Sequence, residues 1–295
     1  VKQHPQAFDF IHYQVRYYSK GVVDPLPIAT VSSQTQALRQ LGLEIVLEML
    51  FYVDKMQRAA KAGSPPLDDP LHYRQQVFAR VLDELDPKDI RHVTIEEENV
   101  WWNDQNSEWQ DRAEFLGILC QKLKNKYPAH SFAQWYSPAR NVNIPGQNGI
   151  PAAKADAWIF DQYHLAGADY VTYVNGMLKL NKPLGSVVWA SPNWQVGGGG
   201  TPNDTWWDTT GWRIFYKQLV VNRANGIPTA LFVYGLGCPG KTTAAPLWQC
   251  TDTCSQRFLD KLINTTLPYL RSPTSQPSPS VPQSRPSWVP DHCGR

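Results

Sequence analysis

The amino-acid sequence predicts an α/β protein built as a TIM-type (β/α)8 barrel, and three observations lead to this fold class. The chain has 295 residues, and barrels of this type typically need about 250. Apolar residues make up 42% of the sequence, which is enough for a sizeable core. Short apolar or aromatic runs alternate with helix-like segments, as in a parallel sheet with crossover helices. A doubly wound open sheet is the alternative fold.

The strands of this barrel are predicted from runs of β-branched and aromatic residues. These runs cover residues 8–14, 43–51, 92–98, 132–136, 157–163, 186–190 and 229–234. A barrel of eight strands needs one more, so we expect the first strand to be atypical or to lie before Val1.

Helix signals occur between these runs. One helix is expected to begin after Asp69, with Pro70 at its first helical position, and another at Ser107, where Gln110 completes a capping box. A third is expected to stop at Gly226. The residues expected on the buried faces are Val77, Phe78, Val81 and Leu85 in the first helix, Trp109, Ala113, Leu116, Cys120 and Leu123 in the second, and Trp212, Phe215 and Leu219 in the third.

Two regions follow from this pattern. Residues 1–270 are assigned to the barrel as a catalytic domain, and residues 271–295 are rich in Pro and Ser. Such a composition is typical of a linker or an extended tail. A linker would lead to an additional module, whereas a tail could lie as a strap on the surface of the barrel.

Charge and hydropathy exclude two classes of partner. The formal net charge is +2 and the charges are mixed along the chain, so there is no basic stripe for nucleic acid. No apolar run approaches the roughly 20 residues that cross a bilayer. We therefore expect neither a nucleic-acid nor a membrane partner.

The spacing of the cysteines indicates whether the protein is secreted and whether it binds a metal ion. Cys238, Cys250 and Cys254 lie close together in sequence, which suggests a disulfide between Cys238 and Cys250 or Cys254 in a secreted, extracellular protein. A zinc site is the weaker alternative, because no His lies nearby. We expect no metal and no cofactor. Cys120, on an apolar helix face, is expected to be a buried free thiol.

The strongest candidate for chemistry is the stretch HVTIEEENVWWND at residues 92–104. Alternation along a strand would direct Val93 and Ile95 toward the helices, and Thr94, Glu96 and Glu98 into the barrel. Two neighbouring carboxylates at the mouth of a barrel repel each other and are partly desolvated, which raises the pKa of one, as a general acid requires. The alternative, a solvated helix start, fits less well because the capping box places that start at Ser107.

Polar and aromatic residues follow the other predicted strands as well. Each could separately be a satisfied core group or a solvated loop residue, but together they form a ring of acids, amides and aromatic rings, which suits a carbohydrate. Of the acids, Asp161 comes at the end of its run, whereas Glu44 and Glu48 lie on the face of the run 43–51 opposite its apolar residues, which would direct both into the barrel. The expected substrate-binding residues are His12, Trp101, Trp102, Tyr136, Tyr163, His164, Asn193, Trp194 and Trp206.

With these residues the chain resembles the (β/α)8-barrel glycoside hydrolases over about residues 8–270. The resemblance is carried by residues 94–99, TIEEEN, followed by Trp101 and Trp102. It implies hydrolysis of glycosidic bonds in a poly- or oligosaccharide, with Glu98, or its neighbour Glu96, as the acid. The commonest layout has a nucleophilic Glu on the seventh strand, where this chain reads VVWASPNW. The second carboxylate would then be Glu48 or Asp161, or the barrel binds a carbohydrate without cleaving it.

A second motif competes with this interpretation. Residues 235–242, GLGCPGKT, match the phosphate-binding loop of nucleotide-binding proteins and follow a predicted strand. That loop must lead directly into a helix, yet Pro246 and two Cys lie where the helix would run. We therefore expect a loop after the last barrel strand, with a nucleotide-binding protein as the less favoured alternative.

Overall fold

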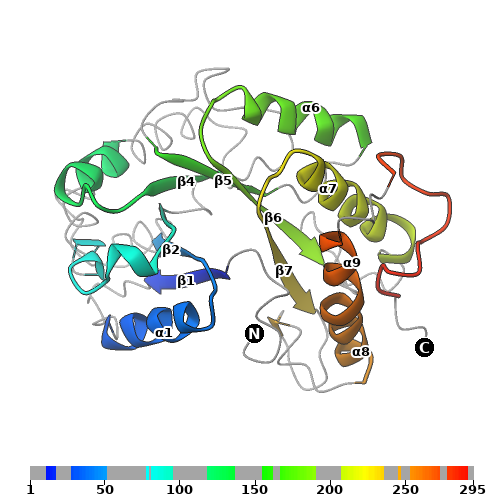
Figure 1. Ribbon diagram of the computed structural model, residues 1–295, viewed down its shortest axis with the longest axis horizontal. Coiled ribbons are helices and arrows are strands. Elements are labelled where there is room, and N and C mark those ends of the chain that lie inside the picture. Colours follow the sequence, from blue (N-terminus) through cyan, green and yellow to red (C-terminus); the bar gives the residue numbers. More distant parts are fainter. Residues whose placement is uncertain are drawn as a thin grey trace, which may run out of the picture. The chain divides into compact units, whose positions relative to one another are not determined.

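Figure 1 shows a computed structural model of the chain. The structure describes residues 11–17, 28–51, 78–79, 81–95, 118–136, 155–161, 167–190, 207–235, 245–246, 253–272 and 278–291. The chain divides into two compact units, which are described separately. The N-terminal unit comprises residues 10–161 and 176–185, and the C-terminal unit comprises residues 1–9, 162–175 and 186–295.

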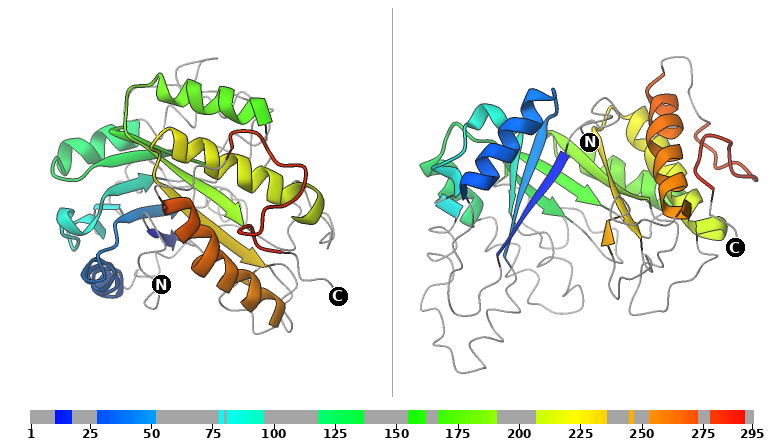
Figure 2. Two further views of the ribbon diagram at one scale, coloured as in Figure 1. Left: turned by 45° about the vertical axis from the view of Figure 1, so that its right-hand side comes forward. Right: turned by 90° about the horizontal axis from the view of Figure 1, so that it is seen from below.

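The N-terminal unit contains a parallel sheet whose strands follow one another in chain order. The strands are β1 (Ile11–Tyr17), β2 (Ile45–Phe51), β3 (His92–Ile95), β4 (Phe132–Tyr136) and β5 (Ala157–Asp161). Each pairs in parallel with the next, with Ile11 opposite Ile45 at the start of β1 and β2. Figure 2 shows these strands side by side, coloured from blue to green.

Helical segments precede three of these strands, and the two longer ones, before β2 and before β4, each bury one face. α1 (Ile28–Gln40) precedes β2, the short 3-10 helix η2 (Pro87–Asp89) precedes β3, and a helical segment at 118–126 precedes β4. The predicted buried faces are confirmed where the structure describes them. The predicted residues that are buried are Phe78, Val81 and Leu85 before η2, and Cys120 and Leu123 in the segment before β4.

The C-terminal unit continues the alternation of helix and strand. Most of α6 (Gly167–Leu178) and of β6 (Leu184–Ala190) belongs to it, followed by η3 (Trp207–Gly211), α7 (Trp212–Ala224) and β7 (Thr229–Gly235). β6 and β7 pair in parallel. The chain then forms β8 (Ala245–Pro246), α8 (Thr253–Lys261), η5 (Leu262–Thr266) and α9 (Leu267–Arg271).

The core of the C-terminal unit is rich in aromatic rings. Trp207 is fully buried, and its ring contacts Phe215 at a centroid distance of 5.5 Å and Phe258 at 5.0 Å. α7 packs its predicted stripe of Trp212, Phe215 and Leu219 into this core. The helix ends as predicted, because Gly226 adopts a φ of +64° just beyond it.

The predicted fold class is confirmed in this α/β arrangement of parallel strands in chain order, and β1–β7 lie at the seven predicted runs. One expectation is wrong: no strand was expected after β7, but Ala245 and Pro246 pair antiparallel with Gly235 and Tyr234. The helix starts predicted at Asp69 and Ser107, and any strand before Val1, lie outside the described residues.

Candidate functional site

Glu48, in the middle of β2, is the first acid of the candidate site that the structure describes. In the register of the sheet, Glu48 on β2 is paired with Gln14 on β1 and with Thr94 on β3. Thr94 is fully buried, and its hydroxyl donates a hydrogen bond to the carbonyl of Leu47 at 3.2 Å. The backbone of Glu48 is therefore held at the level of Thr94, the residue from which the TIEEE stretch continues.

The next two strands, β4 and β5, each end in a predicted site residue. Tyr136 is the last residue of β4 and is paired with Phe160 on β5, and Asp161 is the last residue of β5. Because parallel strands end at one edge of a sheet, the backbones of Tyr136 and Asp161 lie at the edge where barrel enzymes place their active sites.

The remaining site residues are distributed as follows. His12 is the second residue of β1 and is paired with Val46, so it lies near the amino edge of the sheet, because β1 begins three residues later than predicted. The other predicted site residues lie outside the described residues: Glu96, Glu98, Trp101, Trp102, Tyr163, His164, Asn193, Trp194 and Trp206.

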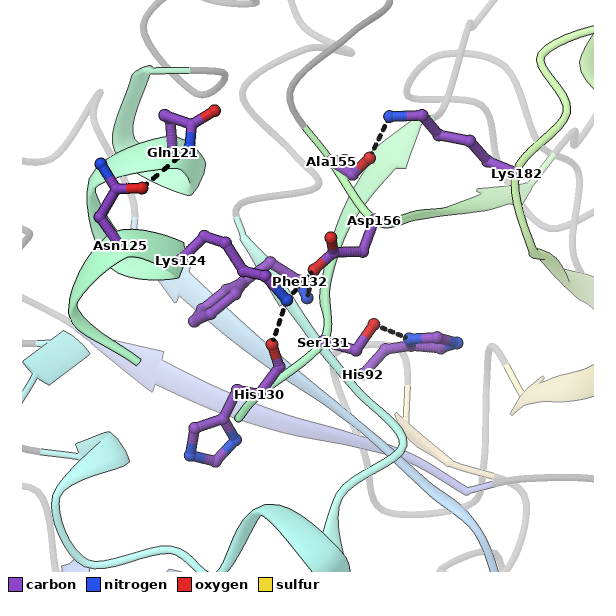
Figure 3. Close-up of polar contacts among 10 residues, drawn as sticks. All are labelled: His92, Gln121, Lys124, Asn125, His130, Ser131, Phe132, Ala155, Asp156 and Lys182. Atoms are coloured by element: carbon purple, nitrogen blue, oxygen red, sulfur yellow. Dashed lines mark hydrogen bonds and ion pairs between the residues drawn. The ribbon is translucent and has the colours of Figure 1, made fainter. Parts of the chain in front are cut away.

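The amino edge of the same sheet holds a polar cluster that the sequence analysis missed (Figure 3). The ring Nδ1 of His92 lies 2.8 Å from the Ser131 hydroxyl. The Asp156 carboxylate accepts a hydrogen bond from the backbone N–H of Phe132 at 2.9 Å and forms an ion pair with Lys124 at 2.9 Å. The available signal was positional for three of these residues, since His92 begins β3 and Ser131 and Asp156 come one residue before β4 and β5.

The electrostatics of this amino-edge cluster are those of a structural network. Burial, followed by the charge of Arg91, lowers the pKa of His92 to about 4. Burial acts to raise the pKa of Asp156, but the Phe132 N–H and the ammonium groups of Lys124 and Lys182 outweigh it and hold that pKa below its usual value. At neutral pH the network therefore contains a neutral imidazole and a compensated carboxylate. Groups at this edge of a barrel serve stability rather than catalysis.

Glu44 belongs to this edge as well, which corrects the expectation that it faces into the barrel with Glu48. Glu44 immediately precedes β2 and forms an ion pair with Arg91, which immediately precedes β3. Its side chain is 46% exposed. Strand alternation places residues on faces, but it does not say at which end of a strand a residue lies.

Cys120 is confirmed as a buried free thiol, with 2% of its surface exposed. Burial raises the pKa of this thiol to about 12, so it is uncharged and unreactive at neutral pH. The proposed partners Cys238 and Cys250 lie outside the described residues, and the disulfide stays a prediction.

Among the described residues, the first element after the phosphate-loop motif is a strand and not the helix that the motif requires. Gly235 is the last residue of β7, and Ala245, ten positions later, pairs back onto it in an antiparallel strand. The next described helix, α8, begins at Thr253. A nucleotide site needs a helix N-terminus directly after the lysine, so that its N–H groups face the phosphates.

The described residues contain no group of three or more His, Cys, Asp or Glu residues that could hold a metal ion. Within the same ranges, no helix is long and apolar enough to cross a membrane.

The chain is similar in fold to several proteins of known structure, at low sequence identity. No family model and no curated protein sequence matches it. An engineered protein of known structure is 15% identical, with a TM-score of 0.52 over 87% of this chain and 62% of that one. A chitinase from Rhizomucor miehei is 14% identical (TM-score 0.49, 77% of this chain and 89% of that one), and a mannanase from Streptomyces sp. SirexAA-E is 18% identical (TM-score 0.49, 80% and 69%). TIM-barrel glycoside hydrolases are thus among the solved structures to which this chain is similar.

Proposed function

We propose that the chain is a glycoside hydrolase that cleaves a poly- or oligosaccharide between two carboxyl groups, with Glu98 as the general acid. The observation that carries this is the placement of acidic residues at the carboxyl edge of a parallel sheet, where Asp161 ends β5 and the TIEEE stretch continues from β3.

The register of the sheet favours Asp161 over Glu48 as the second carboxylate. Thr94 pairs with Ala133, and Ala133 pairs with Ala157. Asp161 is four residues beyond Ala157, as Glu98 is four residues beyond Thr94. If the strand extends to Glu98 in the same register, as its sequence predicts, the two acids share one level of the barrel. Glu48, by contrast, is paired with Thr94, four residues before Glu98.

The spacing of these two strands leads to a stereochemical expectation. β3 and β5 are separated by β4, and two inter-strand spacings amount to about 10 Å between backbones. Carboxyl groups about 6.5–9.5 Å apart leave room for a water between acid and base and give inversion, whereas about 5 Å gives retention. We therefore assign Glu98 the role of acid, Asp161 that of base, and expect an inverted product.

The sugar-binding groups in this proposal are aromatic rings and amides that follow the strands. Trp101 and Trp102 follow the acid, Tyr136 ends β4, and Asn193 and Trp194 come after β6. Aromatic faces stack on sugar rings, and amides bind hydroxyl groups. His12 has no place in this group, because it lies near the amino end of β1. We further propose that the protein acts outside the cell, as the sequence predicts.

The test is a screen of glycans with analysis of the products, followed by substitution of the acids. Glu98→Gln and Asp161→Asn should each lower kcat about 10²–10⁴-fold on the best substrate, because each removes a proton-transfer group. Glu44→Gln is the matched control, since this carboxylate lies at the opposite edge and should leave kcat unchanged. Normal activity of Glu98→Gln would exclude Glu98 as the acid.

Two other outcomes would replace the proposal. Binding of glycans without cleavage of any of them would make the protein a carbohydrate-binding barrel. Equilibrium binding of ATP or GTP with Mg²⁺, abolished by Lys241→Ala, would revive the nucleotide-binding alternative. The antiparallel return of the chain at β8 argues against this second outcome.

A further inference from the structure

The strap, defined as residues 278–291, has the sequence of a linker but packs into a core. Its composition is that of a linker, with prolines at 279, 282, 286 and 290. In the structure, however, Trp288 is 8% exposed and Val289 is fully buried, and both belong to the core of the C-terminal unit. Figure 1 shows the strap in red, beside α7 and α9.

On one side the strap is bound to η3 and α7. The indole N–H of Trp207 donates to the carbonyl of Pro290 at 3.0 Å. The Tyr216 hydroxyl donates to the carbonyl of Ser278 at 3.1 Å, and the ammonium of Lys217 donates to that of Pro279 at 2.6 Å. Side chains from the helices thus donate hydrogen bonds to carbonyls of the strap, which itself forms neither helix nor strand.

On the other side the strap is bound to η5 and α9. The hydroxyl of Thr266 is buried and donates to the carbonyl of Trp288. The Trp288 ring stacks on Tyr269 of α9, with centroids 5.0 Å apart, and on Tyr216 of α7, with centroids 5.3 Å apart. A single side chain of the strap is therefore inserted between two helices that are about 50 residues apart in the sequence.

Aromatic burial rather than ion pairing holds the strap in place. Arg285 forms ion pairs with Asp208 at 2.6 Å and with Asp291 at 2.7 Å, but these carboxylates are 42% and 75% exposed. Exposed ion pairs of this kind contribute little to stability, whereas a buried and stacked Trp contributes much more. The prolines assist, because they restrict the unfolded strap and carry no N–H that must find a partner.

We propose that the strap is an intramolecular clasp in which the Trp288 side chain joins α7 to η5 and α9. Because of this link, these helices and the strap undergo local unfolding together, as one cooperative unit. Arg223 of α7 adds to this coupling, because its guanidinium donates to the carbonyl of Ser272 at 2.5 Å, one residue after α9 ends. The clasp does not depend on the glycosidase proposal.

The experiment is hydrogen exchange followed by mass spectrometry on the full chain, comparing wild type with Trp288→Ala. Amides of α7, of η5–α9 and of the strap should exchange at least tenfold faster in the variant, and by a similar factor. Amides of the segment 118–126 in the N-terminal unit should keep their rates. Ser287→Ala, an exposed neighbour, is the matched control and should match wild type, and Arg285→Gln should change the rates less than threefold.

Two patterns of exchange in Trp288→Ala would contradict the clasp. Faster exchange confined to residues 278–291 would show that the strap is a passive covering, and an equal rise throughout the chain would show a general loss of stability without a local unit. If Trp288→Ala does not fold, Trp288→Phe takes its place, because a smaller ring can still lie between the two tyrosines. A smaller rise in the same three segments would then support the clasp, and a rise in the strap alone would overturn it.

Discussion

At the scale of single residues, His92 shows how burial determines the charge of a group. Its imidazole lies next to the Ser131 hydroxyl, and its pKa falls to about 4 because burial, and then Arg91, disfavour the charged form. The carboxylates of Glu44 and Asp156 act in the opposite direction but do not compensate. The ring is therefore neutral at physiological pH and serves as a hydrogen-bonding group in the amino-edge cluster.

A pH dependence of stability follows from this shift. The pKa of His92 is lower in the folded state than its ordinary value of 6.5, so the unfolded chain takes up the proton first as the pH falls. The associated stability is present above pH 6.5 and is lost as the pH falls toward 4, on the order of 2 kcal/mol after allowance for partial exposure. His92→Gln, which keeps a hydrogen-bonding group, should flatten the free energy of unfolding between pH 6.5 and 4 in urea titrations. An unchanged pH profile in this variant would contradict the assignment, whereas the acid loss below pH 4, to which Asp156 contributes through its lowered pKa, should persist.

At the scale of elements, the end of α7 shows a helix stop that depends on backbone conformation alone. The N–H of Gly226 donates to the carbonyl of Arg223 at 3.0 Å, and that of Ile227 to the carbonyl of Asn222 at 2.9 Å. This pattern requires the positive φ of +64° at Gly226. A Cβ added to Gly226 would meet nothing within 4 Å, so the conformation and not space selects glycine.

Gly226→Ala should therefore lower the free energy of unfolding by about 1 kcal/mol, because alanine in the left-handed region is strained. Gly226→Asn should cost less, since asparagine tolerates this conformation better. Gly42→Ala is the matched comparison, because Gly42 ends α1 with a φ of +77° and also has open space around it. Denaturant titrations measure all three variants. A loss well above 2 kcal/mol would indicate a steric clash and contradict the purely conformational explanation.

The elements also show what the sequence can predict and why the rest escapes it. The strands β1–β7 and the end of α7 were predictable, because apolar runs and a helix-stop glycine are local signals. Glu44 was assigned to the wrong environment, because its partner Arg91 is 47 residues away. β8 escaped because two residues become a strand only by pairing with β7. The burial of the strap escaped prediction because its composition is dominated by Pro and Ser, and the single Trp288 changes that average little.

At the scale of the whole molecule, the candidate site could be predicted only to the level of strand ends. Two backbone positions, those of Glu48 and Asp161, follow from the strands and their register. The choice between them came from pairings across β3, β4 and β5, and such pairings depend on strands that lie far apart in the sequence. The strap likewise becomes part of the molecule through contacts with residues 207–272, which its own composition does not reveal.

The change in Tm on adding an oligosaccharide should distinguish binding of the sugar from its hydrolysis. A ligand that binds only the folded chain at 100 times its Kd adds about 2.7 kcal/mol of stability, a rise of roughly 5 °C in Tm for a chain of this size. Under the proposed mechanism, Glu98→Gln removes the proton donor but none of the proposed sugar-binding rings, so this variant should keep the Tm rise with an intact oligosaccharide. Wild type and Glu44→Gln should lose the rise with time as they hydrolyse the sugar. Thermal scans at increasing delays after mixing measure this difference. Loss of the Tm rise in Glu98→Gln at the first scan would mean that Glu98 holds the sugar in the ground state, and its role as a pure acid would be wrong.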